Sequence, residues 1–111
     1  MKIRTQIDAG ICNFDTVVTA STEDDQNVTF KFISECELIK EFGKQVDKVS
    51  PVDAIATLGP EENPLLSIAR KLLQTKGCCD ACVVPVATVK IMQVAARLAL
   101  PKDVSLTISE D

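Results

Sequence analysis

Cysteine is the residue type with the most chemical potential in this sequence, because the chain has five cysteines and no histidine. The lack of histidine removes the commonest general base and metal ligand, and it excludes Ser-His and Cys-His nucleophilic pairs. The number of cysteines is odd, and residues 1–20 lack the apolar block of a secretion signal. Free thiols or metal thiolates in a reducing cytoplasm are therefore favoured over a disulfide framework.

The strongest local signal is the cysteine cluster at residues 78–82. Cys78, Cys79 and Cys82 all lie in this stretch, and Cys79 and Cys82 form a C-x-x-C pair. This spacing lets two sulfurs reach one ion or each other, which suits zinc, iron–sulfur ligation or dithiol redox chemistry. Thiolates without histidine favour zinc or an iron–sulfur cluster over magnesium or calcium.

The two remaining cysteines lie at the ends of predicted elements. Cys12 falls in the turn between two strands, and Cys36 falls in the first turn of a helix, where unpaired backbone N–H groups favour a thiolate. Element ends can converge in a two-layer fold, so Cys12, Cys36 and the 78–82 cluster are predicted to form one site. The alternative is that these cysteines are packing residues, since free cysteine is commonly buried.

The first third of the chain has the alternation of strands. Apolar and polar residues alternate over residues 1–8, 14–20 and 28–33, and a polar loop occupies residues 21–27. Three consecutive antiparallel strands are therefore predicted.

Helical signals fill most of the remainder. Ser34 and Glu37 have the spacing of a capping box, Ser50-Pro51 is a second start signal, and Asn63-Pro64 is a third. The predicted helices, in chain order, span residues 34–49, 51–58, 64–76 and 84–98.

Strict alternation returns at residues 104–108, which predicts a last strand. The predicted fold is a single α+β domain over residues 1–111, a two-layer sandwich. Its antiparallel sheet would contain the three N-terminal strands plus this C-terminal strand, covered by three to four helices.

Charge and hydropathy exclude two classes of partner. The net charge is −4, the lysines are scattered, and the chain lacks Tyr and Trp, which argues against nucleic acid. No stretch approaches the roughly 18 apolar residues that a membrane span needs. A cytoplasmic protein is expected, and the sequence leaves its oligomeric state open.

The order of strands and cysteines resembles the NifU/IscU-type iron–sulfur cluster scaffolds. Cys12, Cys36 and one cysteine of the 78–82 cluster occupy the places of that family's three cysteines, separated by 24 and by 42 to 46 residues. The resemblance implies a scaffold with a sulfur donor and an apo-protein acceptor as possible partners. Two departures stand out, since Phe14 replaces the Asp that follows the family's first cysteine, and the usual His beside the third is missing.

Two further segments, residues 7–12 and 98–104, are similar to a short protein family of methanogenic archaea. This second resemblance implies an anaerobic cytoplasm, in which exposed thiols and clusters persist. It carries no function with it.

The leading hypothesis is a metal-binding protein and not an enzyme. Cys12, Cys36, Cys79 and Cys82 would ligate an iron–sulfur cluster or zinc, with Cys78 as an alternative ligand, in a scaffold or carrier. One alternative is a thiol-redox or persulfide carrier that exchanges through Cys79 and Cys82, with Cys78 or Cys36 resolving. The other is a small interaction domain whose cysteines only pack.

Overall fold

The sheet is antiparallel and is built mainly from the first third of the chain, as predicted. The structure is a computed structural model that describes residues 1–74 and 77–111, with the side chains of residues 77 and 78 left out. Strands β1 (Lys2–Asp8), β2 (Asp15–Ser21) and β3 (Asn27–Ser34) pair in sequence order, and β4 (Val52–Asp53) adds to the far side of β3. The α+β fold class is confirmed.

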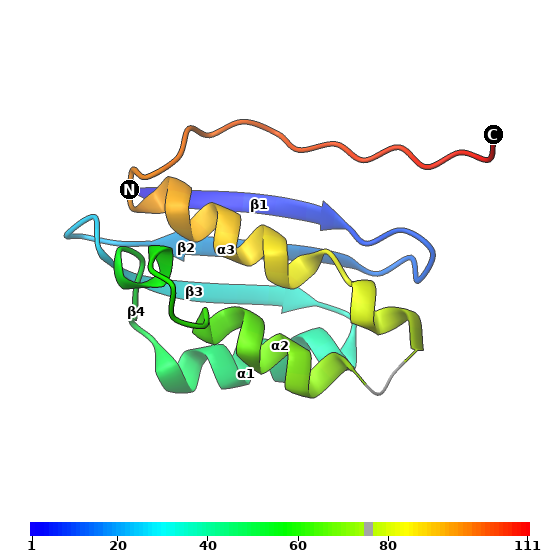
Figure 1. Ribbon diagram of the computed structural model, residues 1–111, viewed down its shortest axis with the longest axis horizontal. Helices are drawn as coiled ribbons and strands as arrows, with labels where there is room; N and C mark the ends of the chain where they lie inside the picture. The colour runs from blue at the N-terminus through cyan, green and yellow to red at the C-terminus, as the bar shows by residue number, and fades with distance from the viewer. Residues whose placement is uncertain (75–76) are drawn as a thin grey trace.

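Three helices cover one face of this sheet (Figure 1). Helix α1 (Glu37–Val49) packs against β3, α2 (Pro64–Leu73) packs against α1 and α3, and α3 (Val84–Ala95) lies across β1 and β2. Short 3-10 helices, η1 (Ala56–Leu58) and η2 (Gly77–Ala81), precede α2 and α3. No helix within the described ranges is both long and apolar enough to span a membrane.

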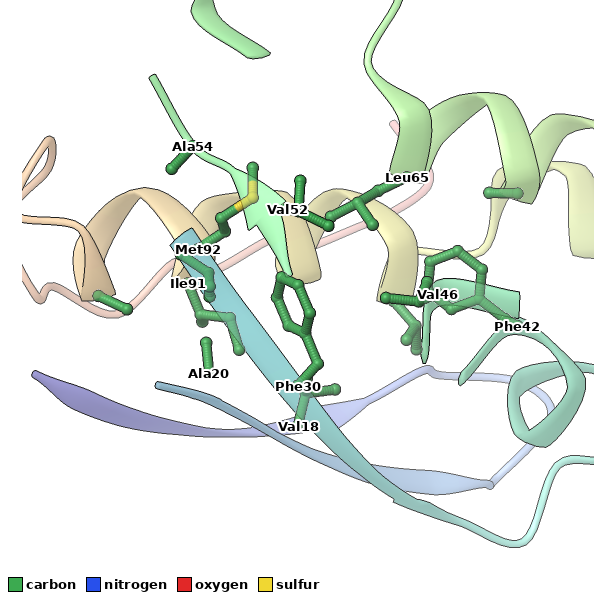
Figure 2. Close-up of a cluster of buried hydrophobic side chains, with 14 of the residues drawn as sticks. Val18, Ala20, Phe30, Phe42, Val46, Val52, Ala54, Leu65, Ile91 and Met92 are labelled. Carbon is green, nitrogen blue, oxygen red and sulfur yellow. The ribbon is translucent and has the colours of Figure 1, made fainter. Parts of the chain in front are cut away.

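The core lies between the sheet and the helices. Figure 2 shows side chains of both layers pointing into one cluster, with Phe30 of β3 directed from the sheet toward the helix layer. Large side chains in this cluster are fully buried, and each contributes about 1.5–3 kcal/mol relative to exposure. They come from β2, β3 and all three helices: Val18, Val28, Phe42, Val46, Leu65, Val84 and Met92.

The start of α1 differs from the prediction by a few residues. Ser34 ends β3, and its Oγ accepts from the Cys36 N–H (3.1 Å) and from the Thr16 hydroxyl (2.9 Å). The helix begins at Glu37 with Cys36 as its N-cap residue. The serine hydroxyl therefore joins β2 to the strand-to-helix junction and does not cap the helix.

The predicted helix at residues 51–58 is wrong for most of its length. Val52 is buried and pairs with Val28, and the Asp53 carboxylate accepts from the backbone N–H groups of Ile55 and Ala56. An aspartate that bonds to nearby backbone amides competes with helical hydrogen bonding. Only Ala56–Leu58 forms a turn of 3-10 helix.

The predicted C-terminal strand at residues 104–108 is also wrong. Residues 101–111 are exposed and form no strand, and the fourth strand of the sheet is β4 instead. Helix α3 covers β1 and β2, so a strand added beyond β1 would find no helix to cover Val104, Leu106 and Ile108. Alternation supplies strand propensity, but pairing also requires an apolar surface to bury against.

Candidate functional site

Three separate connections carry the cysteines, and all three lie at one end of the fold (Figure 1). Cys12 is in the β1–β2 turn, Cys36 joins β3 to α1, and the 78–82 cluster lies in η2 and just before α3. The opposite end holds the β2–β3 turn and the C-terminus of α3. The cysteine-bearing connections therefore share one end of the fold, and a common site for the cysteines stays a prediction.

A turn with unusual backbone angles presents Cys12. Gly10 has φ +89°, Asn13 has φ 59°, and the Asn13 N–H donates to the Gly10 carbonyl (2.9 Å). The Asp8 carboxylate accepts from the Gly10 N–H (3.0 Å) and fixes the start of the turn. A side chain is strained at such a positive φ, so glycine suits position 10. The result is an exposed Cys12 side chain.

Cys36 is held more firmly than Cys12. Its N–H donates to Ser34 and its carbonyl accepts from the Lys40 N–H (2.9 Å), so its backbone is fixed on both sides. Its side chain is half-buried and packs against the core cluster. The rigid strand-to-helix junction thus gives Cys36 a defined position.

The C-x-x-C pair is closed by a short backbone contact. The Cys82 N–H donates to the Cys79 carbonyl (3.1 Å), and both side chains are half-buried against the core. Cys78 is the remaining member of the predicted ligand set, and its side chain lies outside the described residues.

The surroundings of the Cys82 thiol shift its pKa. Burial raises the pKa of the Cys82 thiol, the Val84 N–H at the start of α3 opposes this, and the charges of Cys36, Cys12 and Cys79 raise it further. The Val84 N–H was not predicted, although Pro85 marks a helix start where such a donor would be found.

The thiols are gathered without being arranged as a ligand set. Across residues 1–74 and 77–111, no three Cys, Asp or Glu side chains are placed to hold a metal ion. Cys12, Cys36 and Cys82 are thiols that form no disulfide. Chemically, the site offers soft sulfur donors from three segments, and this donor type suits zinc or iron–sulfur chemistry.

The comparisons with known proteins give a family and no function. A family model described as "Family of unknown function (DUF6951)" matches residues 3–108, almost the whole chain. Neither the curated proteins nor the solved structures contain a match to it.

Proposed function

The chain belongs to the family DUF6951, and from its cysteine site we propose that it binds a zinc ion or an iron–sulfur cluster as a scaffold or carrier. Cys12, Cys36, Cys79 and Cys82 would supply the ligands, with Cys78 as an alternative. The observation that carries the proposal is that the three connections bearing these cysteines lie at one end of the fold. Binding of a metal cation would release the thiol protons, and the charge of the cation would stabilise the resulting thiolates.

The chemical type of the donors suits zinc or an iron–sulfur cluster, but the positions of the described side chains do not yet form a ligand set. Sulfur donors without histidine match the preferences of zinc and iron–sulfur clusters. The described side chains would have to draw together on binding, because no three of them are placed for ligation. Cys12 is the member best able to move, since its turn exposes it while Cys36 and Cys82 pack against the core.

The surroundings of Cys12 support a carrier with protein partners. Ile11 and Phe14 flank the turn and are 90% and 40% exposed. Exposed apolar side chains beside a reactive group favour contact with another protein. A sulfur donor or an apo-protein acceptor, in a reducing cytoplasm, would suit this surface, and the proposal involves no catalytic step.

Metal analysis after purification without oxygen or chelator tests the proposal. We expect stoichiometric iron with acid-labile sulfide, or one zinc per chain. Cys36→Ser and Cys82→Ser should each lose most of this content, because each removes one soft donor. Val83→Ala is the matched control, since it changes an exposed apolar residue beside Cys82 and leaves every thiol in place. Metal-free wild-type protein, or full metal content in both serine variants, would overturn the proposal.

Thiol counting separates this function from its rival. If mild oxidation of the protein as purified removes two thiols per chain without crosslinking chains, thiol exchange between Cys79 and Cys82 replaces metal binding as the proposed function. Metal-protected thiols would not react.

A further inference from the structure

The C-terminal segment, defined as residues 101–111, has the pattern of a strand but no strand partner. Val104, Leu106 and Ile108 alternate with Ser105 and Thr107, and these apolar side chains are 70%, 74% and 85% exposed. The backbone is extended throughout and belongs to no ladder in the sheet. The family model runs to residue 108, so this stretch is part of the family's common sequence.

One edge of the sheet is open beside a helix. β4 pairs only with Asn27 and Val28, so the part of β3 from Thr29 to Ser34 has β2 on one side and no described strand on the other. The Ala54 N–H donates to the Gln26 carbonyl on the β4 side. The backbone groups of successive residues point to opposite edges of a strand. Phe30 and Phe32 therefore direct their N–H and C=O groups to the same side as Gln26, where the edge is open.

A groove of about 350 Å³ runs between this edge and α1. Phe32 and Gly43 are in close contact along it, since a Cβ at Gly43 would lie 3.0 Å from the Phe32 ring. Its lining comes from β3 and α1 alone: Phe30, Lys31, Phe32, Ser34, Lys40, Gly43, Lys44 and Asp47. A strand edge flanked by a helix is a geometry that binds extended peptides by adding a strand.

The charges of the segment and the groove are opposite. Lys31, Lys40 and Lys44 line the groove with a single acid, Asp47, and Lys40 also contacts Glu37 at 3.2 Å. The C-terminal segment carries Asp103, Glu110 and Asp111 against a single lysine, Lys102. Opposite charges at the two surfaces steer association and fix register.

The groove and the segment lie on opposite sides of one chain. Figure 1 shows the C-terminal segment on the β1 side of the sheet and α1 on the β3 side. We propose that the C-terminal segment of one chain adds as a strand to the β3 edge of a second copy, in the groove between β3 and α1. The apolar side chains of residues 104–108 then become covered, and the acidic residues meet the lysines.

Self-association of the full chain is the first test. Sedimentation over about a hundredfold concentration range should show a species of twice the 12.0 kDa mass of one chain. Truncation after Lys102 should abolish it and leave the thermal midpoint of the dilute monomer unchanged, because residues 101–111 contribute nothing to the core cluster. A full chain that stays monomeric throughout would overturn the proposal.

Peptide binding locates the groove. A labelled peptide of residues 102–111 should bind the truncated chain, and the double variant Lys40→Glu/Lys44→Glu should weaken it about tenfold or more. Lys2→Glu/Arg4→Glu, on β1, is the control of equal charge change and should bind within about twofold of the parent. Equal loss in both double variants would show general charge attraction, and loss only in the β1 variant would place the segment at β1. Either result would overturn the assignment to β3.

Discussion

Cys82 and Asp24 show how immediate neighbours set the charge of a residue here. Burial raises the pKa of the Cys82 thiol although the Val84 N–H opposes it. Asp24 is in the opposite situation, because backbone and side-chain donors from Asn27, Gln26 and Thr22 lower the pKa of its carboxyl group. The sequence placed Asp24 only within a polar loop, because the donors converge on its carboxylate only in the folded turn.

Asp24→Asn tests the structural role of this carboxylate. Its pKa is lowered from 3.8 in the folded chain, so it stabilises the fold above about pH 3.8, and this contribution is lost as the pH falls below that value. We expect Asp24→Asn to lower the urea midpoint at pH 7 and the difference from wild type to shrink as the pH drops below 3.8. Glu23→Gln, next in the chain, should show no such trend. A difference that stays constant across this range would contradict the assignment.

At the scale of elements, most starts and stops follow from local residues. Asn63 caps α2 as predicted, and its side chain accepts from the N–H groups of Leu65 (2.9 Å) and Leu66 (3.4 Å). The three long strands and α3 also lie where periodicity placed them. The exceptions, Ser34 and Asp53, are residues whose side chains bond to the backbone in other ways. A capping pattern alone does not distinguish these uses.

Gly43 fixes how closely α1 approaches β3. A Cβ at this position would lie 3.0 to 3.1 Å from three atoms of Phe32. One of them is the Cβ of Phe32, which cannot move away without moving the strand. Overpacking costs about 1–3 kcal/mol, and alanine regains about 1 kcal/mol of helix propensity. Gly43→Ala should therefore lower the free energy of unfolding by about 1 kcal/mol in chemical denaturation.

Gly59→Ala is the matched control for this change, because its nearest neighbour, the Ala56 carbonyl oxygen, lies at an ordinary 3.5 Å. It should stay within about 0.5 kcal/mol of wild type. A Gly43→Ala variant as stable as this control would show that α1 can move away from β3 at little cost.

At the scale of the whole molecule, one apolar cluster joins every layer. Leu65 of α2 is fully buried in this cluster, whereas its neighbour Leu66 is 39% exposed. Leu65→Ala should lower the free energy of unfolding by about 2–5 kcal/mol, because it leaves a cavity where the helices meet the sheet. Leu66→Ala should cost less than about 1 kcal/mol. Urea denaturation measures both free energies of unfolding. Similar decreases in the two variants would mean that Leu65 does not lie on the buried face of α2.

The amphipathic patterns by themselves determined the three long strands, the helices that cover them and the positions of the cysteines at element ends. Periodicity reports which side of an element is apolar, and this information is local. Only the tertiary structure decided that Val52–Asp53 is the fourth strand, because β3 offers Val28 as a partner there while α3 leaves no cover beyond β1. It also gathered Lys31 with Lys40 and Lys44 along one groove, since residues distant in sequence become neighbours only when α1 packs on β3.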